Sequence, residues 1–278
     1  MAAANTISST KRDHGLVKLP ENLVGRDFFV GDIHGDYESL MARLDAVSFD
    51  KSVDRVIAVG DLIDRGPDSR KCLELVYEHW FHSVIGNHED FFLGSFLESD
   101  EGCMLALIRN GGKWAFEEDE GDMGVLAADA LAQLPLAIEV PFKGHTIGVI
   151  HAACTSGAWG FFNLDADVWN RRINQPLGDG SDPLPVEATV SGIDVVVVGH
   201  NVVDRPTIRG NTVNIDGGAA RGRGVTLMSA ADVLFFADVH QKTNNVESVY
   251  MEPGSANDDL IDLLGDDDSS APKSPTTR

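Results

Sequence analysis

Seven side chains that can bind a metal ion or carry a proton follow short apolar segments of the sequence. They are Asp32, His34, Asp61, Asn87, His88, His151 and His200. Carboxylates, neutral imidazoles and an amide oxygen, without a thiolate, suit Mn, Fe, Zn or Mg better than a softer ion. The set exceeds what one ion needs, and two ions about 3.5–4 Å apart are a recurrent arrangement for displacement at phosphorus. The residue types therefore predict a dinuclear centre for phosphoryl chemistry.

The elements that must position these side chains are short β-branched or aromatic segments, typical of buried strands. DFFV, RVIAV, HSVI, TIGVI and DVVVV each precede one of the polar clusters GDIHG, GDLIDRG, GNHE, HAAC and GHN. Open α/β sheets place their chemistry at such strand ends. Apolar periodicity predicts helices over 37–47, 68–80, 89–97 and 125–134. After Val213, closely spaced apolar segments, including VLFFADV, predict further strands, so a layered α/β sandwich of two sheets with outer helices is expected.

Composition excludes several classes of protein. The net charge of −22 over 278 residues argues against a nucleic-acid partner, which requires a basic face. No apolar segment approaches the roughly 18 residues of a membrane span, and the first residues do not resemble a secretory signal. Three scattered cysteines, Cys72, Cys103 and Cys154, do not form a disulfide framework. A cytoplasmic protein without a membrane partner is expected, and a monomer.

The chain divides into three parts by composition. Residues 1–22 are polar and unpatterned, which predicts a flexible N-terminal arm. Residues 23–251 are expected to form one catalytic domain. Residues 252–278 contain seven acidic and two basic residues and are expected to be a disordered acidic tail. The piece DDLIDLLGDDD within this tail could dock on a partner, but a solvated tail is the preferred interpretation.

The five polar clusters, in this order, resemble the motifs of the metallophosphoesterases, specifically of the phosphoprotein phosphatase family. The markers NGGKW, LPLAIEV and NIDGGA are similar to its bacterial and bacteriophage branch, of the lambda phosphatase type. The resemblance spans roughly residues 28–227. It implies the calcineurin-like metallophosphoesterase sandwich, with two mixed β-sheets flanked by helices. It also implies hydrolysis of phosphoserine or phosphothreonine, and possible use of phosphotyrosine, in proteins or peptides.

The resemblance also assigns metal ligands by position. The first ion would be held by Asp32, His34 and Asp61. The second ion would share Asp61 and be held also by Asn87, His151 and His200. Mn²⁺ is the expected metal, with Fe, Zn, Ni or Mg as alternatives. Two such ions would lower the pKa of a bridging water, so that hydroxide attacks phosphorus directly and no phosphoenzyme forms.

Acid catalysis and phosphate binding are assigned to neighbouring residues. Asp64 is expected to pair with one ring nitrogen of His88, so that the other nitrogen faces the leaving group as general acid. Arg65 is expected to hold two phosphate oxygens with its planar fork. In the family a second arginine completes this clamp, and Arg171 is the candidate, with Arg172 as the alternative.

Two motifs suggest other chemistry. CMLALIR (103–109) has the spacing of a cysteine phosphatase loop, but its apolar residues and lack of glycine predict a helix segment in the core. GGAARGRG (217–224) lacks the Lys-Ser/Thr of a nucleotide-binding loop, although its Arg221 and Arg223 could touch the substrate.

Four residues near the clusters have other interpretations. Glu89 is expected to start a helix and Asp216 to form a turn, and neither is expected to bind metal. Asn201 stands where the family usually has threonine, and Ala153 where glycine is common. Packing around the ligands is expected to differ there, but no ligand is lost.

Two alternative functions stay open. Relatives with the same fold hydrolyse diadenosine tetraphosphate symmetrically, but they carry a different residue at the position of Asp64, which favours the monoesterase. A catalytically silent scaffold built on this fold is the second alternative. Silent relatives usually lose ligands or the acid, whereas this chain retains all of them.

Overall fold

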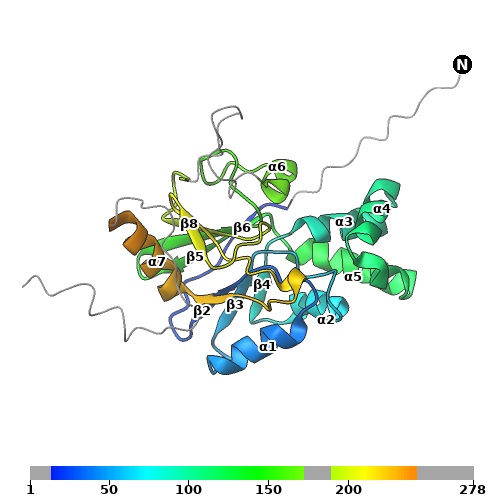
Figure 1. Ribbon diagram of the computed structural model, residues 1–278, viewed down its shortest axis with the longest axis horizontal. Helices are drawn as coiled ribbons and strands as arrows, with labels where there is room; N and C mark the ends of the chain where they lie inside the picture. The colour runs from blue at the N-terminus through cyan, green and yellow to red at the C-terminus, as the bar shows by residue number, and fades with distance from the viewer. Residues whose placement is uncertain (1–13, 172–188, 243–278) are drawn as a thin grey trace, which may run out of the picture.

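Two β-sheets lie at the centre of the protein, with helices around them (Figure 1). The computed structural model describes residues 14–171 and 189–242. The larger sheet has six strands in the order β1-β5-β6-β7-β9-β8, and the smaller has four in the order β10-β2-β3-β4. This architecture confirms the two-sheet sandwich flanked by helices that the sequence predicts.

The strands that end in polar clusters run parallel within each sheet. The smaller sheet consists of β2 (Asp27–Val30), β3 (Arg55–Ala58), β4 (Phe81–Ser83) and the antiparallel β10 (Leu227–Ser229). The larger sheet consists of β1 (Leu16–Lys18), β5 (Ala137–Phe142), β6 (His145–Ile150), β7 (Val195–Val198), β8 (Thr207–Arg209) and β9 (Thr212–Asn214). Because β2, β3 and β4 are parallel, as are β6, β7 and β9, each set delivers its following loops to one edge of its sheet.

All four helices predicted from periodicity are present, with shifted ends. They are α1 (Tyr37–Ala46), α2 (Ser69–Glu74) with the 3₁₀ turn η1 (Leu75–Tyr77), α3 (Asn87–Leu97) and α5 (Glu120–Gln133). The others are α4 (Glu101–Arg109), α6 (Leu164–Trp169), α7 (Ala230–Lys242) and the 3₁₀ turns η2 (Gly112–Phe116) and η3 (Ala219–Arg221). Asp36, Asp100, Asp119 and Asn163 begin α1, α4, α5 and α6 by accepting backbone N–H groups.

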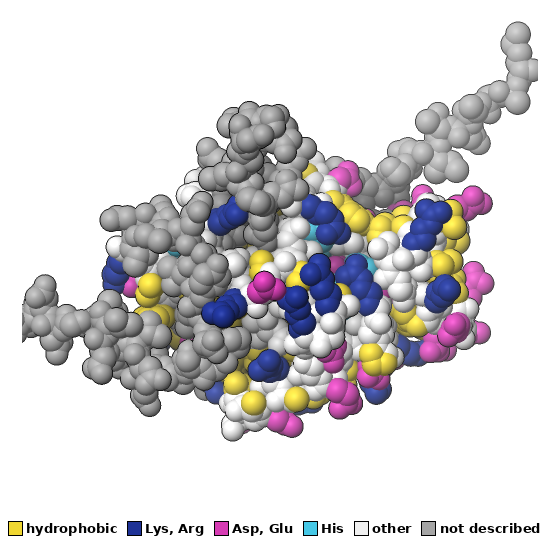
Figure 2. Space-filling model, viewed as in Figure 1, with side chains coloured by type: hydrophobic (Ala, Val, Ile, Leu, Met, Phe, Trp, Pro, Cys, Tyr) yellow, Lys and Arg dark blue, Asp and Glu magenta, His cyan; other side chains and the backbone are white. Residues whose placement is uncertain are grey.

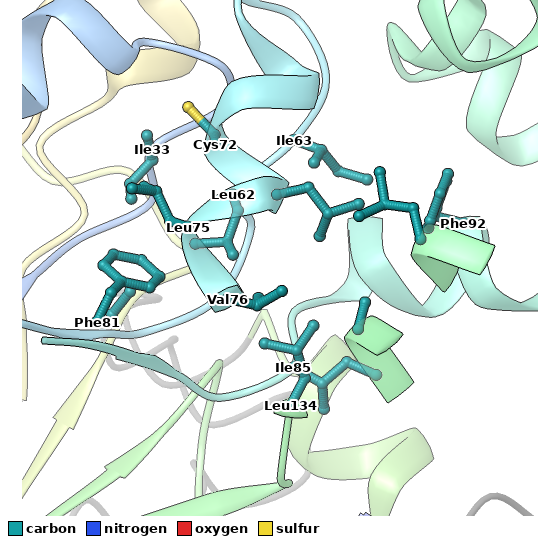
Figure 3. Close-up of a cluster of buried hydrophobic side chains, with 14 of the residues drawn as sticks. Ile33, Leu62, Ile63, Cys72, Leu75, Val76, Phe81, Ile85, Phe92 and Leu134 are labelled. Atoms are coloured by element: carbon teal, nitrogen blue, oxygen red, sulfur yellow. The ribbon is translucent and has the colours of Figure 1, made fainter. Parts of the chain in front are cut away.

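Apolar side chains fill two main layers. One layer lies between the smaller sheet and the helices, and Figure 3 shows Leu75 and Val76 pointing toward Phe81 and Ile85 within it. The second lies between the two sheets and contains Phe29 and Ile57 of the smaller sheet together with strand β7. In β7, Val195 and Val197 face the second layer, whereas Val196 and Val198 pack in a third cluster. Burial on both faces explains the uninterrupted valines of this strand.

The strand expected at VLFFADV is wrong, because these residues lie in α7. The buried positions are Val233, Phe236, Ala237 and His240, which is the spacing of one helix face. A continuous apolar run can form either element, and here length favours the helix. The expected strand VESVYM lies outside the described residues, as do Arg172 and the acidic tail.

A matched pair of substitutions tests the face that α7 buries. Phe236→Ala is expected to lower the free energy of unfolding by about 3–5 kcal/mol, because this fully buried ring of α7 packs in the apolar cluster to which both sheets contribute. Phe235→Ala is expected to cost less than half as much, because Phe235 is only partly buried. In a strand, Phe235 would instead share a face with Val233 and Ala237. Urea unfolding of both variants measures the two losses of unfolding free energy. A larger loss for Phe235→Ala than for Phe236→Ala would contradict the assignment of a helix.

Two other expectations also require correction. Residues 14–22 do not belong to a loose arm, because β1 pairs in parallel with β5, and Asn22 donates to the carbonyl of Val53 at 2.9 Å. The segment CMLALIR is helical as expected, but only part of it is core, since Leu107 is buried while Leu105 is 53% exposed. Among residues 14–171 and 189–242, no helix is both long and apolar enough to cross a membrane.

Candidate active site

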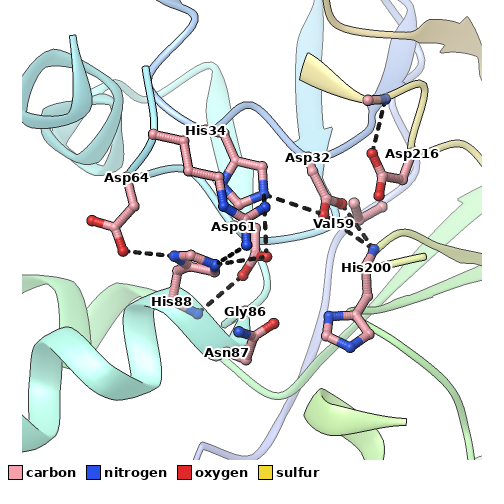
Figure 4. A network of polar contacts seen from close by, with 12 residues as sticks. Asp32, His34, Val59, Asp61, Asp64, Gly86, Asn87, His88, His200 and Asp216 are labelled. Carbon is pink, nitrogen blue, oxygen red and sulfur yellow. Dashed lines mark hydrogen bonds and ion pairs between the residues drawn. The ribbon is translucent and has the colours of Figure 1, made fainter. Parts of the chain in front are cut away.

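The six predicted metal ligands meet where loops from both sheets converge, and Figure 4 shows Asp32, His34, Asp61, Asn87 and His200 among them. All six are buried, and they are Asp32, His34, Asp61, Asn87, His151 and His200. They follow β2, β3, β4, β6 and β7, so the parallel strands of each sheet contribute. Two groups of three ligand atoms share Asp61, one with His34 and His88 and the other with His151 and His200, and within each group the atoms lie within 4.8 Å of one another.

The three proposed ligands of the first ion, Asp32, His34 and Asp61, come close to the spacing of a coordination site. His34 Nε2 lies 3.5 Å from Asp61 Oδ2 and 3.8 Å from Asp32 Oδ2. Donor atoms bound to one ion at about 2.1 Å stand roughly 3–3.5 Å apart around it. His34 Nδ1 donates to the carbonyl of Ile63 at 2.9 Å, which leaves a lone pair on Nε2 that a cation near the two carboxylates could bind. A cation between these three groups fits the donor set.

The second group fits a cation even more clearly. His151 Nδ1 donates to the carbonyl of Val59 at 2.7 Å, so its Nε2 carries a lone pair. That lone pair faces Asn87 Oδ1 and His200 Nδ1 at 3.2 Å each, and Asp61 Oδ1 at 3.4 Å. A proton on His200 Nδ1 can satisfy only one of these contacts. The remaining oxygen and nitrogen lone pairs repel one another unless a positive ion lies among them.

Burial and charge divide the histidines into two kinds. Burial lowers the pKa of His34 and of His200 to about 3 each, and it also lowers the pKa of His151, so all three favour the neutral form that binds metal. Burial also acts to lower the pKa of His88, but Asp61 and the hydrogen bond to Asp64 outweigh it, and the pKa of His88 is raised. Of these four imidazoles, His88 is therefore the one suited to carry a proton.

The predicted pair of Asp64 and His88 is present. Asp64 Oδ2 accepts from His88 Nδ1 at 2.6 Å, and both side chains are buried. Asp64 Oδ1 accepts from Trp114 Nε1 at 2.9 Å, so the carboxylate is held from both sides. Trp114 belongs to the NGGKW marker, but its role as the anchor of Asp64 was missed, because nothing in sequence links positions fifty residues apart.

The two predicted phosphate-binding arginines differ in their surroundings. Arg65 Nη1 lies 2.9 Å from His34 Nε2 and Nη2 lies 2.9 Å from His88 Nε2, and the guanidinium donates to each ring nitrogen only while that nitrogen carries no proton. Arg171 is exposed, and its charge acts to lower the pKa values of His151 and His200, whereas the charge of Arg65 acts on His34 and His88.

Asn201, which stands where the family usually has threonine, orders the backbone next to this second arginine. Its Nδ2 donates to the carbonyl of Asn170 at 3.1 Å. The bond ties the loop after His200 to the residue that precedes Arg171.

Backbone strain is concentrated in these loops. In the described part of the chain, eight non-glycine residues have positive φ, and five of them belong to the site. The five are His34 (48°), Asp61 (50°), Asp64 (73°), Arg65 (73°) and His200 (65°). Such conformations cost about 1–3 kcal/mol each and persist where surrounding contacts impose them, which is common at active sites.

Comparison with known proteins agrees with this geometry. A family model described as calcineurin-like phosphoesterase matches residues 28–214, more than half of the chain. The chain belongs to the calcineurin-like phosphoesterases. This family uses divalent metal ions, and the two groups that share Asp61 could bind them.

Relatives of this phosphoesterase differ in the activity that their names state. Serine/threonine-protein phosphatase 2 of Escherichia coli (strain K12) is 33% identical over 194 residues, which cover 68% of this chain and 86% of the relative. A symmetrical bis(5'-nucleosyl)-tetraphosphatase of Pseudomonas putida (strain F1) is 44% identical over only 64 residues, 22% of each chain. The crystal structure of a putative diadenosine tetraphosphatase superposes with a TM-score of 0.58 at 25% identity, covering 78% of this chain and 94% of that one.

Glu89 has a role in this phosphoesterase that its interpretation as a helix start does not capture. Its carboxylate is fully buried and accepts from the backbone N–H groups of Asp61 and Leu62 at 2.8 Å each. It also accepts from Gly86 N at 2.9 Å and Ile63 N at 3.3 Å. A Cβ at Gly86 would collide with Asp61, so this glycine permits the close approach. Glu89 therefore fixes the loop that carries Asp61 against the start of α3.

Glu89→Gln is expected to weaken Mn²⁺ binding by about tenfold, because groups that orient metal ligands typically contribute this much. The amide of Gln would present donors to backbone donors, so the Asp61 loop loses part of its support. Isothermal titration with Mn²⁺ measures the change without relying on activity. Glu98→Gln, on the exposed end of α3, is the matched control. Equal Mn²⁺ affinity in wild type and Glu89→Gln would contradict this role.

Proposed function

We propose that this protein is a metal-dependent serine/threonine protein phosphatase that hydrolyses phosphomonoesters, with phosphotyrosine as a further substrate. The observation that carries the proposal is the buried Asp64–His88 hydrogen bond of 2.6 Å beside the cluster around Asp61. A phosphoserine leaves as an alkoxide, which requires a proton, and His88 is the imidazole whose pKa is raised. The similarity to serine/threonine-protein phosphatase 2 over most of both chains supports the same choice.

Each residue has a defined role in this proposal. Two divalent ions, proposed as Mn²⁺, would supply the hydroxide nucleophile and positive charge for the phosphate when bound. Asp32, His34 and Asp61 are the proposed ligands of one ion, and Asp61, Asn87, His151 and His200 those of the other. Arg65 and Arg171 bind phosphate oxygens, and His88 donates its proton to the leaving oxygen while Asp64 holds the ring.

Symmetrical diadenosine tetraphosphate hydrolysis is the second candidate, and two observations favour it. One is the short match to the tetraphosphatase of Pseudomonas putida, and the other is the superposition on a putative diadenosine tetraphosphatase. The short match spans 22% of this chain, whereas the phosphatase match spans 68%.

Turnover of a phosphoserine peptide and of diadenosine tetraphosphate, measured side by side with Mn²⁺, tests the choice. Higher kcat/KM on the peptide is expected, and activity on the dinucleotide alone would overturn the proposal. p-Nitrophenyl phosphate with and without a chelator tests the scaffold alternative, since folded protein without chelator-sensitive turnover would favour a silent binding protein.

A further inference from the structure

A compact glycine-rich loop follows β9 beside the proposed active site. This loop, residues 217–224, contains η3. Gly218 and Gly222 adopt left-handed backbone, with φ of 92° and 73°. Gly218 N donates to Asp216 Oδ1 at 3.0 Å, and Val225 N donates to Ser39 Oγ at 3.0 Å, so both ends of the loop are fixed. A fixed loop can hold a side chain in a defined place.

Asp216 connects this loop to the catalytic centre. Figure 4 places its carboxyl beside Asp32 and the backbone of His200. Asp216 is buried, and burial raises its pKa to about 6, with Asp61 contributing. The positive charges of Arg65 and Arg221 both oppose that rise. Arg221 therefore lies within the electrostatic range of the same buried carboxyl as the proposed phosphate ligand Arg65.

The two arginines of the loop have different surroundings. Arg223 forms an ion pair with Asp204, with Nη1 2.7 Å from Oδ1, and its stem would contact a Cβ at Gly218 at 3.3 Å. Arg223 thus connects the glycine-rich loop to the loop that contains Asp204. Arg221 is exposed, and within the described residues its guanidinium makes no hydrogen bond or close ion pair with another side chain. Its five N–H donors are therefore available to an anion from solution.

Charge around the site is distributed unevenly. Residues 199–229 contain four arginines and two aspartates, a net charge of +2 in a chain of −22. Residues 87–133, which form α3 to α5, contain eleven acidic and two basic residues, a net charge of −9. Figure 2 shows Lys and Arg gathered near the centre of one face and Asp and Glu mostly toward its edges. In the same view in Figure 1, the gold segment around residues 215–225 crosses this central region.

We propose that Arg221 forms an anion subsite beside the catalytic centre, which binds an acidic side chain flanking the phosphoserine of a substrate peptide. This subsite depends on the proposed phosphatase function and gives it a substrate class, peptides with an acidic residue on the side of the phosphate that faces the loop. The acidic surface of α3 to α5 would repel the acidic side chain of the peptide. The electrostatic potential of the two surfaces therefore favours one orientation of the peptide.

Three phosphoserine peptides test this subsite, with two aspartates before the phosphoserine, two after it, or alanines in all four positions. One acidic peptide is expected to show kcat/KM about fivefold above the alanine peptide, as an exposed charge pair allows. Arg221→Glu is expected to reduce this ratio to about one or below. The ratio is also expected to fall as NaCl rises from 50 to 500 mM, because salt screens exposed charges.

Arg43→Glu is the matched control, because it makes the same charge change at an exposed position in the last turn of α1. Thermal unfolding verifies that both variants are folded. An acidic preference that survives Arg221→Glu, or falls equally in Arg43→Glu, would overturn the subsite while leaving the phosphatase in place, as would equal rates on all three peptides. Failure to hydrolyse any peptide, with p-nitrophenyl phosphate still cleaved, would overturn the proposed function and the subsite together.

Discussion

His88→Asn is expected to reduce kcat on a phosphoserine peptide by about 10²–10⁴-fold while metal content stays near that of wild type. The imidazole donates a hydrogen bond from Nδ1 to Asp64 Oδ2, and its Nε2 lies 3.9 Å from Asp61 Oδ2, at the edge of the proposed centre. Asn cannot carry a proton to the leaving oxygen. Steady-state kinetics together with elemental analysis of the purified variant measure both quantities.

The identity of the leaving group sharpens this prediction. p-Nitrophenolate is a stable anion and leaves without a proton, whereas the serine alkoxide requires one. His88→Asn is therefore expected to lose much less activity on p-nitrophenyl phosphate than on the peptide. Asp64→Asn is the companion variant, because it keeps the shape and removes the carboxylate that, after Asp61, raises the pKa of His88. If His88→Asn instead loses a metal ion, His88 is a ligand of the group formed with His34 and Asp61.

The sequence predicted the strands before the polar clusters because each is a short β-branched or aromatic segment followed by a polar cluster, which in four of the five cases begins with glycine. It predicted α1, α2, α3 and α5 from their periodicity. It failed at α7, where VLFFADV has an apolar side chain on nearly every side and periodicity cannot separate the two elements. It also failed at β1, because three residues with one partly buried side chain show no pattern, and their order comes from pairing with β5.

Most of the candidate site could also be predicted from the sequence, but for a different reason. Asp32, His34 and Asp61 occur in short motifs whose spacing follows from the sharp turns at strand ends, so residue identity carries the information. Glu89 and Trp114 contribute through contacts with residues 28 and 50 positions away, and those pairings exist only in the folded chain. Arg221 stood out in the sequence only as one of two arginines in a glycine-rich loop, and the folded chain shows that the hydrogen bond from Gly218 to Asp216 fixes this loop beside the site.

Arg65→Ala is expected to lower kcat/KM on a phosphopeptide by about 10²-fold and to weaken inhibition by inorganic phosphate by about tenfold. The guanidinium lies between the two histidines, with one nitrogen 2.9 Å from His34 Nε2 and the other 2.9 Å from His88 Nε2. Both histidine Nε2 atoms face the proposed reacting centre, so the guanidinium of Arg65 can reach phosphate oxygens bound there. Arg65→Ala is expected to weaken binding of both the ground state and the transition state, because the phosphate carries negative charge in both.

Metal affinity separates this role of Arg65 from a structural one. The lone pair of His34 Nε2 either accepts from Arg65 or binds a cation, so removal of the guanidinium is expected to leave Mn²⁺ affinity unchanged or higher, opposite to Glu89→Gln. Arg65→Lys keeps the charge but loses the two-pronged geometry, and it is expected to recover only a small part of kcat/KM. Full recovery by Lys would reduce the role to charge alone. Unchanged phosphate inhibition in Arg65→Ala would remove Arg65 from the phosphate site.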